Sequence, residues 1–293
     1  MSDVSGVSGV GAAHGFPWGH FAAGLPWSAP AALAVMLVTF AVAVRKGMHR
    51  IVDIAWGLGF TAVALTSLLA STGAGGDPVR RVLVTALTAL WGLRLAGHIA
   101  RRGRGHGEDP RYARLLAKAP GDPNLYALRM VYLLQGALVW LVSLPVQAAH
   151  YVPDPMGWVA WVGVALWAVG LFFEAVGDAQ LARFKADPAN RGQIMDRGLW
   201  RYTRHPNYFG DFCVWWGLFL LAAGSIPVAV AVVVAPLVMS LLLTRGSGQR
   251  LLEQHMSSRP GYAGYVARTS GFFPRPPRSR GGPAAASRPP SGR

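Results

Sequence analysis

Long apolar runs, separated by short polar and basic stretches, dominate this chain. A helix that crosses a bilayer needs about 20 apolar residues, and seven runs come close to that length. They lie at residues 27–44, 51–70, 80–100, 125–148, 156–177, 208–223 and 225–244. The pattern therefore predicts an all-α polytopic membrane protein, with seven transmembrane helices in one membrane domain over residues 27–274.

Composition agrees with this prediction. The chain has 293 residues, of which 52% are hydrophobic and 14% are charged, whereas soluble domains carry about 25% charged residues. The net charge is +15, but the basic residues lie between apolar runs and in the tail, so a nucleic-acid partner is not indicated. The one cysteine, Cys213, lies inside an apolar run, so we expect no disulfide and no metal site.

The basic residues also predict an orientation. They concentrate in the loops after the first, third and fifth apolar runs and after the last one. Because Lys and Arg favour the cytoplasmic side, we expect the N-terminus outside and the C-terminus in the cytoplasm. Residues 1–26, which contain no Lys or Arg, should form a loose tail. Residues 275–293, rich in Pro, Gly, Ser and Arg, should form a disordered basic tail that contacts anionic lipids.

The most polar stretch with candidate chemistry is Asp196–Asp211. Pro206 suits the first position of a helix, which would place Asn207 and Asp211 four residues apart on one face. Three arginines precede that helix: Arg197, Arg201 and Arg204. Free N–H groups at a helix start and several arginines favour an anion, a phosphate or a carboxylate. A positively charged membrane boundary is the alternative, but it leaves Asn207 and Asp211 unexplained.

Several ionisable residues fall inside the apolar runs, where each costs at least about 2.5 kcal/mol. They are Asp53, Arg94, Glu174 and Asp178. Each acid can pair with an arginine and fix helix packing, but several at one depth favour a polar cavity. The sequence has no Rossmann, Walker or zinc-protease motif. A bound nucleotide would therefore have to be held by a different kind of site.

These residues resemble the bacterial members of the steroid 5α-reductase-like membrane family. That family is related to the 3-oxo-5α-steroid 4-dehydrogenases and shares a superfamily with isoprenylcysteine carboxyl methyltransferase. The resemblance covers about residues 45–274 and is strongest over Gly198-Leu-Trp-Arg-Tyr-Thr-Arg-His-Pro-Asn-Tyr-Phe-Gly-Asp211. Supporting motifs are Asp53-Ile-Ala-Trp-Gly, Trp91-Gly-Leu-Arg, Glu108-Asp-Pro-Arg-Tyr112, Glu174-x-x-x-Asp178-x-Gln-Leu-x-x-Phe-Lys185 and Arg259-Pro-Gly-Tyr-x-x-Tyr265.

The resemblance implies an oxidoreductase of the bacterial inner membrane that acts on CH–CH groups. NADPH would reduce a carbon–carbon double bond in a lipid or steroid-like small molecule. The matched catalytic positions are Asp53, as a proton-sharing acid, and Trp91, where the reductases have a tyrosine. The matched cofactor-binding positions are Arg94, Asp178, Lys185, Arg197, Tyr202, Arg204, His205, Asn207 and Asp211.

Two other function classes stay open at this point. A membrane methyltransferase that uses S-adenosylmethionine shares the Arg204-His-Pro-x-Tyr208 pattern, and Leu251-Leu-Glu-Gln with Tyr262-x-x-Tyr265 loosely matches the tail of that branch. A non-catalytic lipid-binding or scaffold protein would suit the aromatic-rich helices, but it gives no reason for Asn207, Asp211 and the arginines.

Overall fold

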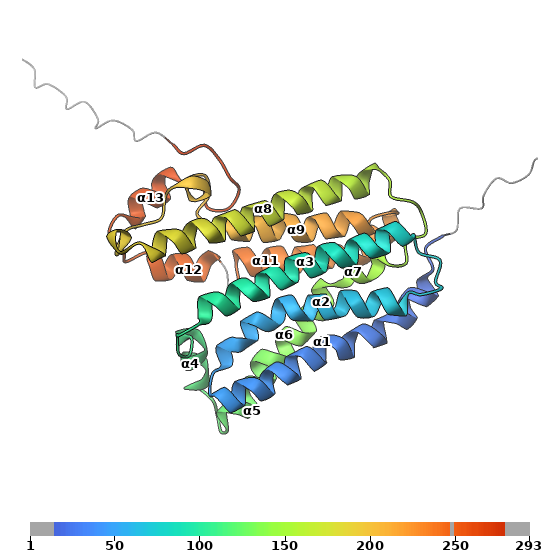
Figure 1. The fold of residues 1–293 in the computed structure, drawn as a ribbon, viewed down its shortest axis with the longest axis horizontal. Coiled ribbons are helices and arrows are strands. Elements are labelled where there is room, and N and C mark those ends of the chain that lie inside the picture. Colours follow the sequence, from blue (N-terminus) through green and yellow to red (C-terminus); the bar gives the residue numbers. More distant parts are fainter. Residues whose placement is uncertain (1–14, 247–248, 279–293) are drawn as a thin grey trace, which may run out of the picture. The chain divides into compact units, whose positions relative to one another are not determined.

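The computed structural model describes residues 15–246 and 249–278. The regular secondary structure of this part of the chain is helical, apart from one isolated bridge between Thr203 and Ser270 (Figure 1). The α-helices are α1 Trp18–Lys46, α2 Val52–Ala70, α3 Pro78–Gly103, α4 Pro110–Leu116, α5 Pro123–Ala127, α6 Leu134–Val142, α7 Leu144–Ala149, α8 Trp158–Ala186, α9 Pro206–Ala222, α10 Ile226–Val232, α11 Val234–Thr244, α12 Gln249–Met256 and α13 Tyr262–Arg268. A π-helical stretch, Leu128–Leu133, joins α5 to α6, and 3-10 turns occupy His49–Ile51, Pro188–Asn190 and Gly198–Arg201.

Six helical stretches in the described residues are long and apolar enough to cross a membrane. They are Trp18–Lys46, His49–Ala70, Pro78–Gly103, Pro123–Ala149, Trp158–Ala186 and Ile226–Thr244. They support a polytopic helical membrane protein. The remaining predicted span coincides with α9, which has only 17 residues. At 1.5 Å per residue it extends about 26 Å, less than the ~30 Å hydrocarbon core, so the count of seven stays a prediction.

The first helix corrects one predicted boundary. It begins at Trp18 rather than at residue 27, and it runs through Pro26 and Pro30. Membrane helices tolerate internal prolines because neighbouring groups satisfy the freed carbonyls, so those prolines do not end this helix. The predicted loose tail therefore cannot include residues 18–26, and residues 1–14 lie outside the described part of the chain.

Asp-Pro pairs start several of the helices and turns. In each pair the aspartate carboxylate accepts a backbone N–H of the following turn, and the proline fills the first helical position, which needs no donor. The pairs are Asp77-Pro78, Asp109-Pro110, Asp122-Pro123 and Asp187-Pro188. This local chemistry explains why the loop between α3 and the next span folds into α4 and α5.

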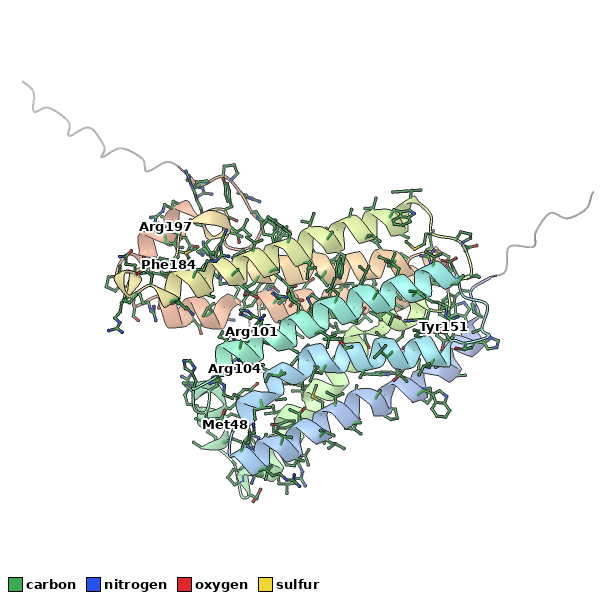
Figure 2. All side chains as sticks on the ribbon, viewed as in Figure 1. Met48, Arg101, Arg104, Tyr151, Phe184 and Arg197 are labelled. Carbon is green, nitrogen blue, oxygen red and sulfur yellow. The ribbon has the colours of Figure 1, made fainter. Side chains whose placement is uncertain are left out.

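The described chain divides into two compact units. The first comprises residues up to 164 together with 218–235, and the second comprises residues 165–217 together with those from 236 onward. In the first unit α2 packs against both α1 and α3 (Figure 1). A Cβ added at Gly57 would lie 2.0 Å from the carbonyl oxygen of Gly92, so only glycine permits this approach. Figure 2 shows Met48, Arg101 and Arg104 at one end of this unit and Tyr151 at the other.

The second unit contains a similarly close contact between helices. A Cβ on Gly210 of α9 would lie 2.5 Å from the carbonyl oxygen of Gly170 in α8. Small residues of this kind let membrane helices pack backbone to backbone. The indole N–H of Trp216 in α9 also donates to the Ser240 hydroxyl of α11, at 3.2 Å. These contacts hold the start of α9, where the candidate cofactor residues lie.

Candidate functional site

A polar cluster in the first unit surrounds Asp53, which lies in the first turn of α2. One oxygen of its carboxylate accepts a hydrogen bond from the Tyr112 hydroxyl at 2.5 Å, and the other accepts one from Arg111 at 2.9 Å. Arg111 also donates from Nε to Asp109, at 3.1 Å. The Asp109-Pro110 start of α4 places both partners in one helical turn. We refer to Asp53, Asp109, Arg111 and Tyr112 as the Asp53 cluster.

The charges of this cluster fix its protonation. Burial and then the Asp53 carboxylate raise the pKa of Tyr112, so its hydroxyl keeps its proton at neutral pH. Burial alone would lower the pKa of Arg111, but Asp109 and Asp53 outweigh burial and raise it. Burial would likewise raise the pKa of Asp109, but Arg111 holds it below its usual value. The cluster thus presents a neutral hydroxyl beside a charged network.

Polar groups continue from Asp53 along α2. The indole N–H of Trp56 donates to the Gln135 side chain at 2.7 Å. The predicted catalytic residue Trp91 is buried in α3, where its ring packs edge to face on Phe60 with 5.5 Å between ring centres. Arg94, one turn further along α3, is half-buried. The structure therefore brings Asp53 together with Tyr112, which was quoted above only as the end of the Glu108-Asp-Pro-Arg-Tyr112 motif.

In the second unit, residues 196–206 form a tightly held segment that we call the signature turn. The N–H of Leu199 donates to the Gln180 side chain at 2.9 Å, and the indole N–H of Trp200 donates to the carbonyl of Gly177 at 3.0 Å. Gly198 has a φ of 57°, and a Cβ there would lie 2.5 Å from the Gln180 amide, so this position requires glycine. The turn is thereby fastened to α8, and α9 begins at Pro206 as predicted.

The Glu253 carboxylate of α12 binds the side chains of the two residues that follow Thr203 in this turn. One of its carboxylate oxygens accepts hydrogen bonds from Arg204 Nε at 3.0 Å and from His205 Nε2 at 2.9 Å. Arg204 also donates to the carbonyl of Thr269 at 2.6 Å. Arg204 and His205, both predicted to bind the cofactor, are therefore engaged with the C-terminal part of the chain. We refer to Arg204, His205 and Glu253 as the Glu253 cluster.

Burial dominates the electrostatics of His205. Burial lowers its pKa, and the hydrogen bond to Glu253 opposes this shift without cancelling it. Burial would raise the pKa of Glu253, but the hydrogen bonds from His205 and Arg204 hold it below its ordinary value. A neutral His205 ring thus donates to an ionised carboxylate. Its other nitrogen, Nδ1, is buried and has no hydrogen-bond partner in the part of the chain described.

The other predicted cofactor residues of the second unit belong to α8, the signature turn and α9. Asn207 is half-buried, and its side chain makes no hydrogen bond to the described residues. Asp211 is half-buried one turn later, and Asp178 is buried in α8. Gly177, the neighbour of Asp178, packs on Pro206, since a Cβ there would lie 3.2 Å from the proline ring. Lys185 and Tyr202 are exposed.

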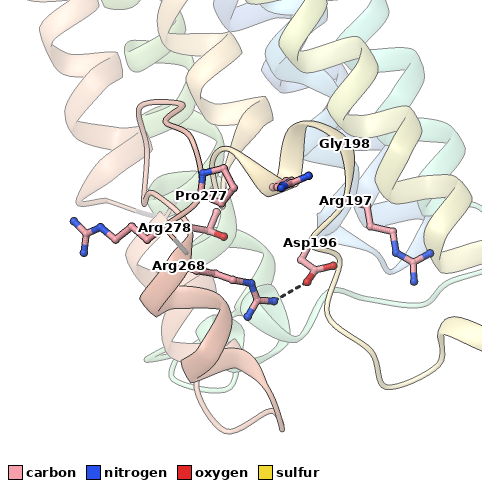
Figure 3. A pocket seen from close by; sticks show the side chains of 8 residues that line it. Asp196, Arg197, Gly198, Arg268, Pro277 and Arg278 are labelled. Carbon is pink, nitrogen blue, oxygen red and sulfur yellow. Dashed lines mark hydrogen bonds and ion pairs between the residues drawn. The ribbon is translucent and has the colours of Figure 1, made fainter. Parts of the chain in front are cut away.

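A pocket of about 620 Å³ opens beside the signature turn (Figure 3). Its lining residues come from that turn and from residues 268–278, which we call the C-terminal segment. They are Asp196, Arg197, Gly198, Arg201, Arg268, Thr269, Pro277 and Arg278. Arg268 donates to the Asp196 carboxylate at 2.6 Å, the dashed contact in Figure 3.

The C-terminal segment corrects a second predicted boundary. The disordered tail was expected to begin at residue 275, but the N–H of Arg275 donates to the carbonyl of Tyr202 at 3.0 Å, and that of Arg278 donates to Arg268 at 3.0 Å. Backbone pairing that reaches back across the sequence is not visible in composition, which is why a Pro/Arg-rich stretch was read as a tail. Residues 279–293 lie outside the described residues.

Sequence reasoning missed Arg268 and Arg278. It quoted Tyr112 only as part of the Glu108-Asp-Pro-Arg-Tyr112 motif, without a site role, and it connected Glu253 only with the methyltransferase alternative. The Asp109-Pro110 helix start was a usable signal for Tyr112, because it announces an ordered turn in a loop otherwise read as basic linker. No local signal marks Arg268 or Arg278. Their place at the pocket depends on contacts with residues far away in the sequence.

A family model described as "Protein of unknown function (DUF1295)" matches residues 39–269. This chain belongs to that family. An uncharacterized protein of Schizosaccharomyces pombe is 24% identical to this DUF1295 member over 248 residues, which cover 76% of this chain and 72% of the yeast protein. A probable O-methyltransferase of Ustilaginoidea virens is 38% identical over 63 residues, only 22% of each chain. No solved structure matches.

Proposed function

We propose that this DUF1295 protein is an integral membrane oxidoreductase that uses NADPH to reduce a carbon–carbon double bond in a lipid or steroid-like substrate. The hydrogen bond between Tyr112 and Asp53 carries the proposal. Reduction of an enone needs a hydride at one carbon of the double bond, a hydrogen-bond donor at the carbonyl oxygen, and a proton from solvent at the other carbon. Methyl transfer from a sulfonium to a carboxylate needs no such donor. The Asp53 cluster therefore suits the first reaction better.

The residues of this cluster take distinct roles. Tyr112, kept protonated by burial and by Asp53, has a single hydroxyl proton. When a substrate binds, this hydroxyl turns from Asp53 and donates its hydrogen bond to the substrate carbonyl, which it polarises. Until then Asp53 holds the tyrosine hydroxyl in place, and Arg111 holds Asp53. The resemblance implies a tyrosine on the third helix, where this chain has Trp91. In our proposal Tyr112 supplies the hydroxyl and Trp91 packs in the wall behind it.

The second unit offers groups that fit NADPH, which supplies the hydride when it is bound. The Asn207 amide can donate and accept at once, as the carboxamide of a nicotinamide requires. The guanidinium groups of the exposed residues Arg197 and Arg201, which make no hydrogen bond or ion pair with the described residues, suit phosphate oxygens. Arg204 and His205 would shape the turn through Glu253. Asp178, Lys185, Tyr202 and Asp211 complete the proposed cofactor set of this unit, and Arg94 is the proposed cofactor residue of the first unit.

The proposal also includes the finer topology predicted from the sequence. Seven helices would cross the inner membrane of a bacterium, with α9 as the short sixth span. The N-terminus would lie outside and the C-terminus in the cytoplasm, where NADPH is available. The basic loops after α1 and α3 support this orientation.

The first experiment compares ligands by thermal stabilisation of the detergent-purified protein. A true ligand at 100 times its Kd adds about 2.7 kcal/mol to the stability of the folded state. We expect NADPH to raise the melting temperature and S-adenosylmethionine to leave it unchanged. The reverse result would reject the reductase, and no response to either compound would favour a lipid-binding or scaffold protein.

The second experiment tests Tyr112. The Tyr112→Phe variant removes only the hydroxyl, so we expect turnover of an enone substrate to fall by about 10²-fold or more. NADPH should still stabilise the variant as it does the parent. Tyr126→Phe, which removes a hydroxyl from the nearby α5, is the matched control. Parent-like turnover in Tyr112→Phe would contradict the proposed role.

A second candidate function is an S-adenosylmethionine-dependent methyltransferase. The Glu253 cluster favours it, because hydrogen bonds join the two stretches on which that resemblance rests, Arg204-His-Pro and Leu251-Leu-Glu-Gln. The partial match to a probable O-methyltransferase points the same way. Stabilisation by S-adenosylmethionine, lost in Glu253→Gln, would select this function over the reductase.

A further inference from the structure

The pocket beside the signature turn has an unbalanced charge. Four guanidinium groups line it, those of Arg197, Arg201, Arg268 and Arg278, and Asp196 supplies the one carboxylate among its lining residues. The Asp196 carboxylate forms an ion pair with the Arg268 guanidinium at 2.6 Å. Within the described residues, the side chains of Arg197, Arg201 and Arg278 make no ion pair or hydrogen bond. Protein surfaces usually intersperse the two signs of charge, so this concentration suits an anionic ligand.

The backbone around these arginines is firmly held. The Tyr265 hydroxyl donates to the carbonyl of Trp200 at 2.6 Å, and the N–H of Arg204 donates to the carbonyl of Ser270 at 2.9 Å. Arg268 is further positioned over the Tyr265 ring, 5.9 Å from its centre. These contacts fix the signature turn against the C-terminal segment. The two walls of the pocket are therefore ordered before any ligand arrives, which lowers the entropic cost of binding.

The arginine side chains themselves are less constrained. In Figure 3 Arg268 points toward Asp196, whereas Arg197 and Arg278 extend to opposite sides of the pocket. A bound ligand would pull the side chains of Arg197 and Arg278 into the pocket. Guanidinium groups bind phosphate oxygens through paired N–H donors, a geometry that lysine cannot reproduce. The volume of about 620 Å³ exceeds that of a bare phosphate and lies in the usual range for small-molecule sites.

We propose that this pocket binds a phosphate group carried by a larger molecule, and that the C-terminal segment supplies half of the site through Arg268 and Arg278. The proposal rests on the proposed function only where the phosphate belongs to NADPH. The phosphate of an anionic lipid headgroup has the same chemistry, and a signature turn that leads into the apolar helix α9 would place the pocket near a membrane surface.

The test uses the full chain in nanodiscs of neutral phosphatidylcholine, with 2′,5′-ADP as the probe. This compound carries phosphates of the NADPH type but no nicotinamide. The variant Arg201→Gln/Arg278→Gln keeps the pocket backbone and removes two charges. We expect its affinity to fall at least about tenfold, the effect of losing a charge-assisted hydrogen bond. The control Arg275→Gln changes an exposed arginine of the same segment that does not line the pocket.

A second arm separates the two sources of phosphate. The parent and the double variant are each placed in nanodiscs that contain phosphatidylglycerol. Native mass spectrometry then compares how much phosphatidylglycerol stays bound to each protein. Arginine-dependent binding of 2′,5′-ADP supports a nucleotide phosphate, and arginine-dependent retention of phosphatidylglycerol alone supports a lipid phosphate. If neither depends on Arg201 and Arg278, the proposal is overturned.

These outcomes are separable from the fate of the proposed function. Binding of 2′,5′-ADP in a protein that shows no NADPH-dependent reduction would reject the reductase and keep the phosphate site. NADPH-dependent reduction that continues unchanged in the double variant, together with unchanged 2′,5′-ADP binding, would reject the phosphate site and keep the reductase.

Discussion

Individual carboxylates in this chain are stabilised by neighbours that differ in chemistry. Asp53 accepts hydrogen bonds from a tyrosine hydroxyl and from one arginine, and this arrangement leaves a protonated hydroxyl beside the carboxylate. Glu253 accepts hydrogen bonds from Arg204 and from a neutral histidine, and these bonds join two segments that are distant in the sequence. The first arrangement suits chemistry and the second suits positioning. A sequence shows the acids but not which neighbours reach them.

Protonation of His205 gives a prediction for the pH dependence of stability. Its pKa in the folded protein is lowered by burial, while the unfolded chain takes up the proton near pH 6.5. The unfolded state therefore binds more protons as the pH falls below about 6.5, and folding stability declines. His205→Gln keeps a donor for Glu253 but cannot titrate. We expect its melting temperature to fall less than that of the parent between pH 7.5 and pH 5.5.

The control for this measurement is His106→Gln, which replaces an exposed histidine and should follow the parent curve. Identical pH slopes for His205→Gln and the parent would show that His205 is not the group responsible. Only the difference between the slopes is used, because other groups titrate in the same range.

At the scale of elements, helix packing depends on a few glycines at close crossings. Gly210 of α9 touches the backbone of α8 at Gly170, and this contact sets the depth at which Asn207 and Asp211 lie relative to Asp178. An added methyl group has no room there, so the helices must separate or bend. The position of the candidate cofactor residues follows from this one crossing.

Gly210→Ala should therefore destabilise the protein by about 1–3 kcal/mol, the usual effect of overpacking. Gly97→Ala is the matched control, because a Cβ at Gly97 of α3 meets no atom within 4 Å, and alanine favours a helix over glycine by up to about 1 kcal/mol. Melting curves of the parent and both variants in one detergent compare their stabilities. A Gly210→Ala variant as stable as Gly97→Ala would mean that the crossing is loose.

The elements could be predicted from the sequence to the extent that local rules decide them. Apolar length placed most of the long helices, and proline chemistry placed the start of α9 at Pro206. The start of the first helix was predicted wrongly, because residues 1–26 were expected to form a loose tail, whereas α1 begins at Trp18. The approach of Tyr112 to Asp53 and of Glu253 to Arg204 was not predictable, since each joins residues far apart in the chain.

At the scale of the whole molecule, orientation in the membrane is the property that the charges predict most directly. The described part of the chain has six helical stretches long enough to span, and α9 decides whether the termini lie on opposite sides. An odd number of spans separates the termini, whereas an even number brings them together. The topology can therefore be tested without knowing the activity.

Reporter fusions at residue 5 and residue 285 should give opposite signals, with the N-terminal reporter active outside and the C-terminal one active in the cytoplasm. A third fusion after residue 224, in the turn that follows α9, should report the outside if α9 crosses. Signals from the same side at both termini would reject the seven-span topology and leave α9 as a helix that enters the membrane without crossing it.

The fastening of the signature turn by the C-terminal segment has a consequence for biosynthesis. Thr203 donates to the carbonyl of Phe272, 69 residues further along the chain, and Arg204 reaches Thr269 and Glu253 in the same region. A ribosome makes these partners after all of the apolar helices of the described chain, the last of which ends at Thr244. The apolar helices are thus complete while the pocket beside the signature turn still lacks the residues that form one of its walls. A message cut short after α11 would yield a protein that inserts and accumulates, yet never acquires a ligand site.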